Sequence, residues 1–303
     1  MTAFTTASAH HGASAATTAA TDAAMAPAAP ATVTTTTQYL ARAGGRIAYD
    51  VRGEGPLVVA VPGMGDIRGV YRFLAPQLVD AGYRVATMDL RGHGESDTTF
   101  DAYDDVAAGR DILALVDALG GGPAILVGNS MGAGAAAWAA AESPGSVRAL
   151  VLIGPFVRNA PVARGAALAF RLALLRPWGP AAWQAWYRKL YPGRAPADLA
   201  RHQAQIRHSL RRPGAWKAFS RTTHTSHEPA AARLGEISLP TLVVMGDADP
   251  DFKDPRAEAA WIAGTLRGRT LIVDGAGHYP HAEYPEIVGP AVVDFLRSEA
   301  PRA

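Results

Sequence analysis

Cysteine is absent from this 303-residue chain, and other features that would narrow its function are scarce. Without a thiol, the chain can form no disulfide, no zinc–thiolate site and no cysteine nucleophile. No apolar run approaches the ~18 residues that a membrane-spanning helix needs. The formal net charge of +2 is too small to indicate nucleic-acid binding. What remains is an apolar chain, 49% hydrophobic, that can bury the core of one large α/β domain with an insertion.

The first 37 residues differ in composition from the rest of the chain. Alanine and threonine dominate there, and the first basic residue of the whole chain is Arg42. A secretory signal needs a positive n-region and a continuous apolar h-region, and neither is found. Residues 1–37 are therefore predicted to be a disordered tail, within which Met25 offers an alternative start. We expect the protein to be cytoplasmic.

From Gln38 onward, strand-like and helix-like segments alternate. Short apolar runs predict strands, and apolar residues at helical spacing predict helices. This alternation is typical of an α/β fold in which a mostly parallel sheet has helices on both faces. The expected strands are Gln38–Arg42 and Arg46–Val51, which form a hairpin, then Leu57–Val61, Tyr83–Met88, Ala124–Val127, Val147–Ile153, Thr241–Met245 and Thr270–Val273. The expected helices are Tyr71–Ala81, Asp101–Leu119, Ala133–Ala141, Arg256–Thr265 and Pro285–Arg297.

One long segment interrupts the alternation. Residues 156–233 carry no strand pattern and read as several helices separated by proline and glycine, with four of the six tryptophans. An excursion of this kind between two sheet strands is predicted to form a helical cap over the carboxyl edge of the sheet, where open α/β sheets bind ligands. The domain prediction is therefore a core of residues 38–155 and 234–303 with a cap of residues 156–233.

The pentapeptide Gly128-Asn129-Ser130-Met131-Gly132 is the most informative motif. It follows an apolar strand and leads into an alanine-rich helix, which is the context of a nucleophile elbow. Such a turn strains the serine backbone, so the flanking glycines are needed where a side chain would collide with neighbouring strand or helix. Ser130 is the predicted nucleophile.

A serine hydroxyl is a weak nucleophile and needs an adjacent base. His278 follows the last predicted strand in a glycine-containing loop and is the predicted base. The acid that orients its imidazole should follow an earlier strand, where Asp247 and Asp249 both lie. We assign Asp249, which comes later in the loop, and leave Asp247 as the alternative, with a turn-forming role as its default. The chain order Ser, Asp, His results.

These motifs make the chain resemble the α/β-hydrolase superfamily, in particular its capped esterase, carbon–carbon hydrolase and haloperoxidase-like branch. The segment Asp89-Leu90-Arg91-Gly92-His93-Gly94-Glu95-Ser96 also resembles the family's loop after the fourth strand, and there His93 is expected to be structural. The resemblance implies an oxyanion hole made by the backbone N–H groups of Met64 and Met131. Pro62 stands where many relatives carry histidine, so the anchoring of the Met64 loop can differ.

The resemblance implies a Ser-His-Asp hydrolase that acts on a carboxylic ester or related acyl compound through an acyl-enzyme, with no cofactor and no metal. A serine at the elbow argues against epoxide hydrolases and haloalkane dehalogenases, which use aspartate there. Three alternatives stay open: carbon–carbon hydrolysis of ring-fission products, haloperoxidase-like perhydrolysis, and a small-molecule receptor without catalysis. The oligomeric state leaves no signal in the sequence.

Charge divides unevenly between the predicted domains. Between Arg158 and Arg233 there are 14 lysines and arginines and two acids, Asp198 and Glu228, so this segment carries +12 and the remainder −10. One interpretation is a solvated arginine-rich surface; the other is a cap that attracts an anionic substrate, a phosphopantetheine-linked acyl group or an anionic membrane. Four cap histidines are expected at the surface, without metal: His202, His208, His224 and His227.

Overall fold

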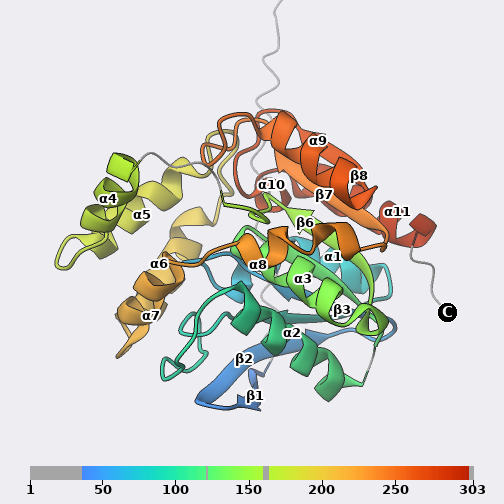
Figure 1. Ribbon diagram of the computed structural model, residues 1–303, viewed down its shortest axis with the longest axis horizontal. Helices are drawn as coiled ribbons and strands as arrows, with labels where there is room; N and C mark the ends of the chain where they lie inside the picture. Colours follow the sequence, from blue (N-terminus) through green and yellow to red (C-terminus); the bar gives the residue numbers. More distant parts are fainter. Residues whose placement is uncertain (1–35, 121, 160–163, 300–303) are drawn as a thin grey trace, which may run out of the picture.

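The computed structural model describes residues 36–120, 122–159 and 164–299 (Figure 1). Its centre is one eight-stranded sheet in the order β1-β2-β4-β3-β5-β6-β7-β8. The first two pairings, β1 with β2 and β2 with β4, are antiparallel, and all the others are parallel. The strands are β1 (Gln38–Arg42), β2 (Gly45–Arg52), β3 (Leu57–Val61), β4 (Arg84–Met88), β5 (Ala124–Asn129), β6 (Val147–Ile153), β7 (Thr241–Gly246) and β8 (Arg269–Val273).

The central strands are almost entirely apolar because helices cover both sheet faces. Every residue of β3, β5 and β7 is buried. The predicted mostly parallel α/β sheet is therefore confirmed, including the initial hairpin.

Helices form a layer on each face of the sheet (Figure 1). The apolar side chains of α2, α3 and α9 belong to one buried cluster, and those of α1 and α11 to another on the opposite face. These helices are α1 (Leu74–Asp80), α2 (Asp105–Leu119), α3 (Met131–Glu142), α9 (Pro255–Leu266) and α11 (Pro285–Glu299), with the short α10 (Pro280–Glu283) before the last of them.

Two helices begin later than the sequence pattern predicts. Helix α2 begins at Asp105 and not at Asp101, because Asp104 caps it: the Asp104 carboxylate accepts a hydrogen bond of 2.8 Å from the Ala107 N–H. Helix α1 begins at Leu74, after a separate 3-10 turn, η1 (Arg68–Arg72). Helix boundaries depend on such caps, which the apolar periodicity does not record.

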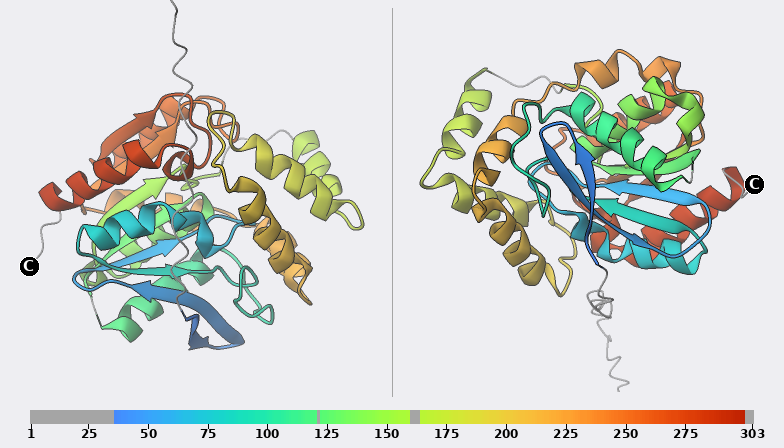
Figure 2. Two further views of the ribbon diagram at one scale, coloured as in Figure 1. Left: turned by 180° about the vertical axis from the view of Figure 1, so that it is seen from behind. Right: turned by 90° about the horizontal axis from the view of Figure 1, so that it is seen from below.

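Between β6 and β7 the described residues form helices and no strand. Helices α4 to α7 lie to the left of the layered core in Figure 1, and Figure 2 shows them apart from it in two further views. They are α4 (Arg164–Ala173), α5 (Gly179–Lys189), α6 (Leu199–Arg211) and α7 (Ala215–Thr222), followed by α8 (Glu228–Ala231), while two further 3-10 turns are η2 (Pro144–Ser146) and η3 (Leu234–Glu236). The tail predicted for residues 1–37 lies outside the described residues, apart from Thr36 and Thr37. Within the described part, no helix has the length and apolarity to cross a bilayer.

Candidate active site

Ser130 lies at the sharp turn between β5 and α3. Its φ of 56° and ψ of −124° fall in a region that residues with a side chain rarely adopt. The turn is closed by small residues: a Cβ at Gly132 would lie 2.4 Å from the Val61 carbonyl oxygen, and a Cβ at Gly128 would lie 2.4 Å from the Gly132 carbonyl oxygen. The strained turn thus depends on both glycines, as the sequence predicts.

His278 and Asp249 meet in the interior from two different loops. His278 follows β8 and Asp249 follows β7, and each is 2% exposed. The Nδ1 atom of His278 lies 2.7 Å from Oδ2 of Asp249. With Nδ1–H donating to the carboxylate, Nε2 is left as the acceptor that a general base needs.

The structure gives the neighbouring Asp247 other partners. Its carboxylate accepts hydrogen bonds from the Gly275 N–H at 2.6 Å and from Arg256 at 2.8 Å. These bonds, the Gly275 N–H above all, lower the pKa of Asp247. Of the two acids left open by the sequence, it is Asp249 that contacts His278.

Ser130 and His278 share neighbours but form no hydrogen bond with each other among those of the described residues. The Ser130 N–H donates to the Ile153 carbonyl at 2.9 Å, and Asn129 Nδ2 donates to both the Ile153 carbonyl (3.0 Å) and the His278 carbonyl (3.3 Å). A Cβ at Gly154 would lie 3.1 Å from His278 Nδ1. Hydrogen bonds of catalytic pairs are often long before substrate binds.

The loop after β3 runs beside Ser130. A Cβ at Gly63 would lie only 2.6 Å from the Ser130 Cβ, so the Met64 peptide that follows is adjacent to the serine. Within the described part of the chain, the N–H groups of Met64 and Met131 donate no hydrogen bond. Both are therefore available to an oxygen that carries negative charge beside Ser130.

His93 anchors this loop from the core side. Its Nε2 accepts a 3.0 Å hydrogen bond from the Gly65 N–H, and its Nδ1 lies 2.9 Å from the Arg91 carbonyl. Burial lowers the pKa of His93 to about 4, so the ring stays neutral and can accept that bond. His93 thus supplies an anchor for a loop in which Pro62 stands where many relatives carry histidine, and its contacts agree with the expected structural role.

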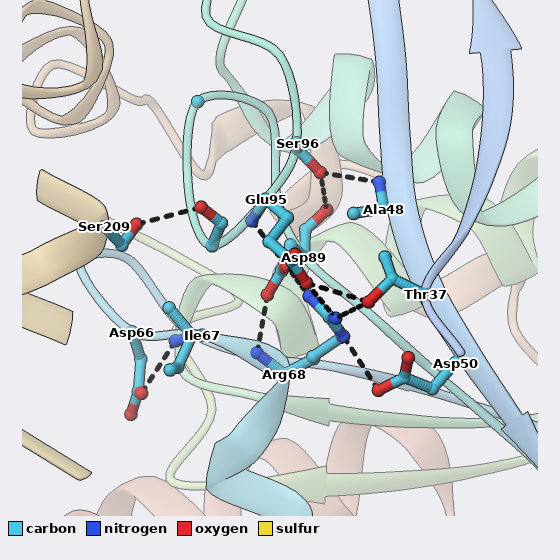
Figure 3. A network of polar contacts seen from close by, with 12 residues as sticks. Thr37, Ala48, Asp50, Asp66, Ile67, Arg68, Asp89, Glu95, Ser96 and Ser209 are labelled. Carbon is cyan, nitrogen blue, oxygen red and sulfur yellow. Dashed lines mark hydrogen bonds and ion pairs between the residues drawn. The ribbon is translucent and has the colours of Figure 1, made fainter. Parts of the chain in front are cut away.

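A largely buried ion network that the sequence analysis did not identify joins the segment after β3 to the segment after β4 (Figure 3). Arg68 forms ion pairs with Asp89, Asp50 and Glu95, and its backbone N–H donates to Asp89 at 2.7 Å. Burial lowers the pKa of the Arg68 guanidinium, but these carboxylates, Asp89 above all, outweigh burial and raise it. Because the partners are distant in sequence, no local motif reveals the network.

A cavity of about 900 Å³ lies beside this network, and Ser130 is not among its lining residues. Strand β2, η1 and α6 supply most of its lining, which includes Arg46, Arg68 and Arg72. These arginines form ion pairs with Asp97, Asp89 and Asp198, among others. The charges of these three arginines are therefore paired within the protein.

A second carboxylate that the sequence analysis did not identify faces the histidine. Oδ2 of Asp251 lies 3.7 Å from Nδ1 of His278. Asp249, Asp251 and His278 together offer three ligand atoms within 4.8 Å of one another and could hold a cation. Since Asp249 already occupies Nδ1, an acid–base pair explains the geometry without a metal, and the expected absence of a metal stays a prediction.

The His278 ring is strongly basic in this environment. Burial lowers its pKa, but the Asp249 carboxylate, assisted by Asp251, outweighs burial and raises the pKa of His278 from 6.5 to about 9. The aromatic ring of Phe156 packs against it edge-on at 5.8 Å between centroids. The base is therefore held in an apolar, carboxylate-supported position.

The expectation that the four cap histidines lie at the surface is wrong for two of them. His202 is 1% exposed and bonds Asp66, and His227 is largely buried and bonds Asp105 at 2.7 Å. Both pairs join residues 156–233, the predicted cap segment, to buried acids of the predicted core. His208 and His224 are exposed, as expected.

Several cap arginines likewise pair with acids of the core. Arg158 binds Glu258 at 2.6 Å, Arg194 binds Glu286, and Arg233 binds Glu142 at 2.5 Å. In the opposite sense, core Arg72 binds cap Asp198 at 2.8 Å. The uneven distribution of charge between the two segments therefore includes attraction across their junction.

Comparison with known proteins places the chain in a family. Residues 56–285 match the family model for the alpha/beta hydrolase fold. The 2-(acetamidomethylene)succinate hydrolase of Mesorhizobium japonicum is 30% identical over 272 residues, which cover 83% of this chain and 92% of that protein. The 2-hydroxy-6-oxo-6-phenylhexa-2,4-dienoate hydrolase of Comamonas testosteroni is 30% identical over 275 residues, covering 83% and 91%.

A solved structure extends the comparison to an esterase. The thermophilic esterase of Thermogutta terrifontis matches with a TM-score of 0.68 and 25% identity, over 84% of this chain and 94% of that one. The family match spans both sides of the cap segment, and the relatives are aligned over most of their length. The chain belongs to the α/β-hydrolase fold family and is a hydrolase.

Proposed function

We propose that this hydrolase cleaves carboxylic esters or related acyl compounds through a Ser130-His278-Asp249 triad. The observation that carries the proposal is the 2.7 Å contact between His278 Nδ1 and Asp249 Oδ2. It accompanies a serine, Ser130, that is held at positive φ in the turn after a neighbouring strand. The unused N–H groups of Met64 and Met131 beside Ser130 supply the oxyanion hole. Residues 156–233 serve as the cap in this proposal.

The reaction proceeds in two halves. His278 Nε2 takes the Ser130 proton as Oγ attacks the carbonyl carbon, and Asp249 stabilises the imidazolium that forms. The oxyanion receives hydrogen bonds from Met64 and Met131, and the leaving group departs with the proton from His278. Water, deprotonated by His278, then attacks the acyl-enzyme and releases the acid and free Ser130.

A carbon–carbon hydrolase is the second candidate. A relative named for 2-hydroxy-6-oxo-6-phenylhexa-2,4-dienoate hydrolysis is 30% identical over most of both chains, which favours this reading more than the fold alone does. Around the triad, the aromatic rings of Phe156 and Phe252 pack at 4.9 Å between centroids and form an apolar wall. An apolar wall suits either an acyl chain or a ring-fission product.

Labelling with a fluorophosphonate, followed by peptide mapping, tests the mechanism, and turnover of p-nitrophenyl esters of increasing acyl length tests the substrate class. Modification of Ser130 together with ester turnover supports the proposal. Labelling of Ser130 without ester turnover, but with cleavage of a ring-fission product, selects the carbon–carbon alternative. A folded protein that is neither labelled nor active would contradict both reactions and leave the receptor alternative.

The pKa of His278 sets the expected pH dependence. Because the base must be neutral and its pKa is about 9, kcat/KM for a neutral ester should rise about tenfold per pH unit at neutral pH and level off near pH 9. Asp251→Asn removes one charge that raises this pKa, so its profile should shift to lower pH. Stopped-flow or steady-state rates from pH 6 to 10 measure both curves.

Asp274→Asn is the control for that shift. Asp274 lies four residues before His278, but its side chain is 84% exposed and pairs with Arg256. Its removal should leave the profile in place. An inflection near 6.5 in the wild-type enzyme, or identical profiles for the wild type and Asp251→Asn, would show that these carboxylates do not control the base.

A further inference from the structure

Three cap side chains form hydrogen bonds with the loop that carries the proposed oxyanion donor Met64. From α5, Trp183 Nε1–H donates to the Gly65 carbonyl at 3.2 Å, and the Tyr187 hydroxyl donates to Asp66 Oδ2 at 2.7 Å. From α6, His202 Nε2 lies 2.8 Å from Asp66 Oδ1. The two residues that follow Met64 are therefore bound by the cap.

These contacts are fully desolvated. Asp66 and Tyr187 are 0% exposed, His202 is 1% exposed and Trp183 is 4% exposed. A buried carboxylate is costly unless it is paired and hydrogen-bonded, and loss of one partner leaves it poorly compensated. Asp66 meets this requirement with bonds from His202, from Tyr187 and from the Ile67 N–H at 2.7 Å.

The protonation states suit a fixed set of donors and acceptors. Burial raises the pKa of Asp66, but its partners, His202 above all, outweigh burial and lower it, so the carboxylate stays ionised. Burial, and then the charge of Asp66, raises the pKa of Tyr187 well above 10, so the phenol keeps the proton that it donates. The Asp66 carboxylate thus stays an acceptor and the Tyr187 hydroxyl stays a donor across the neutral pH range.

Gly65, the residue after Met64, is held by hydrogen bonds on both sides. The Gly65 N–H donates to His93 of the core at 3.0 Å, while the Gly65 carbonyl accepts from Trp183 of the cap. At Gly65 φ is +73°, and a Cβ there would lie 2.3 Å from the Trp183 ring. No larger residue than glycine fits at position 65 beside the Trp183 indole. Because Trp183 belongs to α5, the orientation of the Met64–Gly65 segment depends on the position of that helix.

From these hydrogen bonds we infer that four residues position the Met64 oxyanion donor: Asp66, Trp183, Tyr187 and His202. The cap then completes the catalytic machinery in addition to covering it, because displacement of α5 or α6 releases the loop that points the Met64 N–H at the reacting oxygen. The inference rests on the proposed function and concerns the same site. An oxyanion donor acts only when it is held at the position where charge develops.

Tyr187→Phe tests the inference because it deletes one hydroxyl and keeps the ring. Loss of a whole oxyanion donor costs roughly 100- to 1,000-fold in kcat, so a displaced donor should cost roughly 10- to 100-fold. KM should change by less than about threefold, since the donor acts on the transition state. The affinity for a trifluoromethyl ketone, whose serine adduct carries the oxyanion, should fall by the same factor as kcat/KM, whereas the affinity for the product acid should not.

Asp198→Asn is the matched control. It breaks another cap-to-core contact, the 2.8 Å pair with Arg72, without touching the Met64 loop, so kcat and ketone affinity should stay within about threefold of the wild type. If Tyr187→Phe fails to fold, Trp183→Phe, which loses one N–H donor to the loop, replaces it.

The outcomes separate the inference from the proposed function. A wild-type enzyme that hydrolyses esters and is labelled at Ser130, combined with Tyr187→Phe at full kcat and full ketone affinity, overturns the inference alone. Equal losses in Tyr187→Phe and Asp198→Asn also overturn it, because they would reflect general loosening of the cap. A wild-type enzyme with neither turnover nor labelling removes the proposed function, and the inference with it.

Discussion

Replacing Ser130 with alanine is expected to reduce ester hydrolysis by at least roughly 10⁴-fold. The substitution removes only Oγ, the atom that forms the acyl-enzyme in the proposed mechanism. No other described side chain at the turn offers a nucleophile to replace it, because the neighbours of Ser130 are Asn129 and Met131. Steady-state rates and fluorophosphonate labelling of the purified variant measure the effect, and both signals should disappear together.

Ser143→Ala is the control for Ser130→Ala. Ser143 follows the other end of helix α3, where its hydroxyl contacts Ser146 at 2.8 Å, and its loss should leave turnover unchanged. Thermal unfolding of both variants confirms that the comparison is made between folded proteins. A Ser130→Ala enzyme that retains more than a few per cent of wild-type kcat would exclude the serine mechanism, since no acyl-enzyme could then lie on the main route.

The proposed catalytic residues could be located from the sequence because each is tied to a local pattern. Ser130 lies between two glycines at a strand–helix junction, and His278 and Asp249 each follow an apolar strand. Parallel strands bring their carboxyl ends to one edge of a sheet, so residues that follow different strands can meet there. The fold and the His278–Asp249 contact follow from that rule.

The contacts that support the site could not be read in the same way. Asp66 and His202 are 136 positions apart, and the chain between them forms much of the sheet and half of the cap. Neither residue differs locally from a solvated aspartate or histidine, so the expectation of a surface His202 was the reasonable one and was wrong. Ile206 and Leu210 follow His202 at intervals of four residues, so all three lie on one face of helix α6. That face is buried, and His202 is buried with it.

The charge asymmetry of the sequence also has a structural counterpart that composition does not reveal. Arg158, Arg194 and Arg233 reach acids of the core, so part of the cap's positive charge is used within the chain. Surface pairs of this kind contribute little to stability individually. In the proposed cap arrangement, these pairs nevertheless favour one position of residues 156–233 against the core. The contacts of Tyr187 and His202 with Asp66 then fix that position. This interpretation lessens the need for an anionic ligand to explain the arginines.

Asp249→Asn should lower kcat by about 10⁴-fold, whereas Asp247→Asn should lower it by no more than a few-fold. The asparagine at position 249 no longer stabilises the imidazolium and can turn its amide toward His278 Nδ1, which favours the wrong tautomer. Asp247 instead closes the loop through the Gly275 N–H and Arg256, so its loss weakens a turn and not the base. The pair compares the same substitution at two acids that are two residues apart.

Asp251 gives the experiment a further step. With its Oδ2 3.7 Å from Nδ1 of His278, Asp251 can support part of the imidazolium charge in the Asp249→Asn variant. The double variant Asp249→Asn/Asp251→Asn should therefore be slower than Asp249→Asn by roughly tenfold, about 1.4 kcal/mol of barrier. Measured kcat values at pH 9 decide the matter. Equal rates for the single and double variants would limit Asp251 to tuning the pKa, and a larger loss in Asp247→Asn than in Asp249→Asn would reassign the acid of the triad.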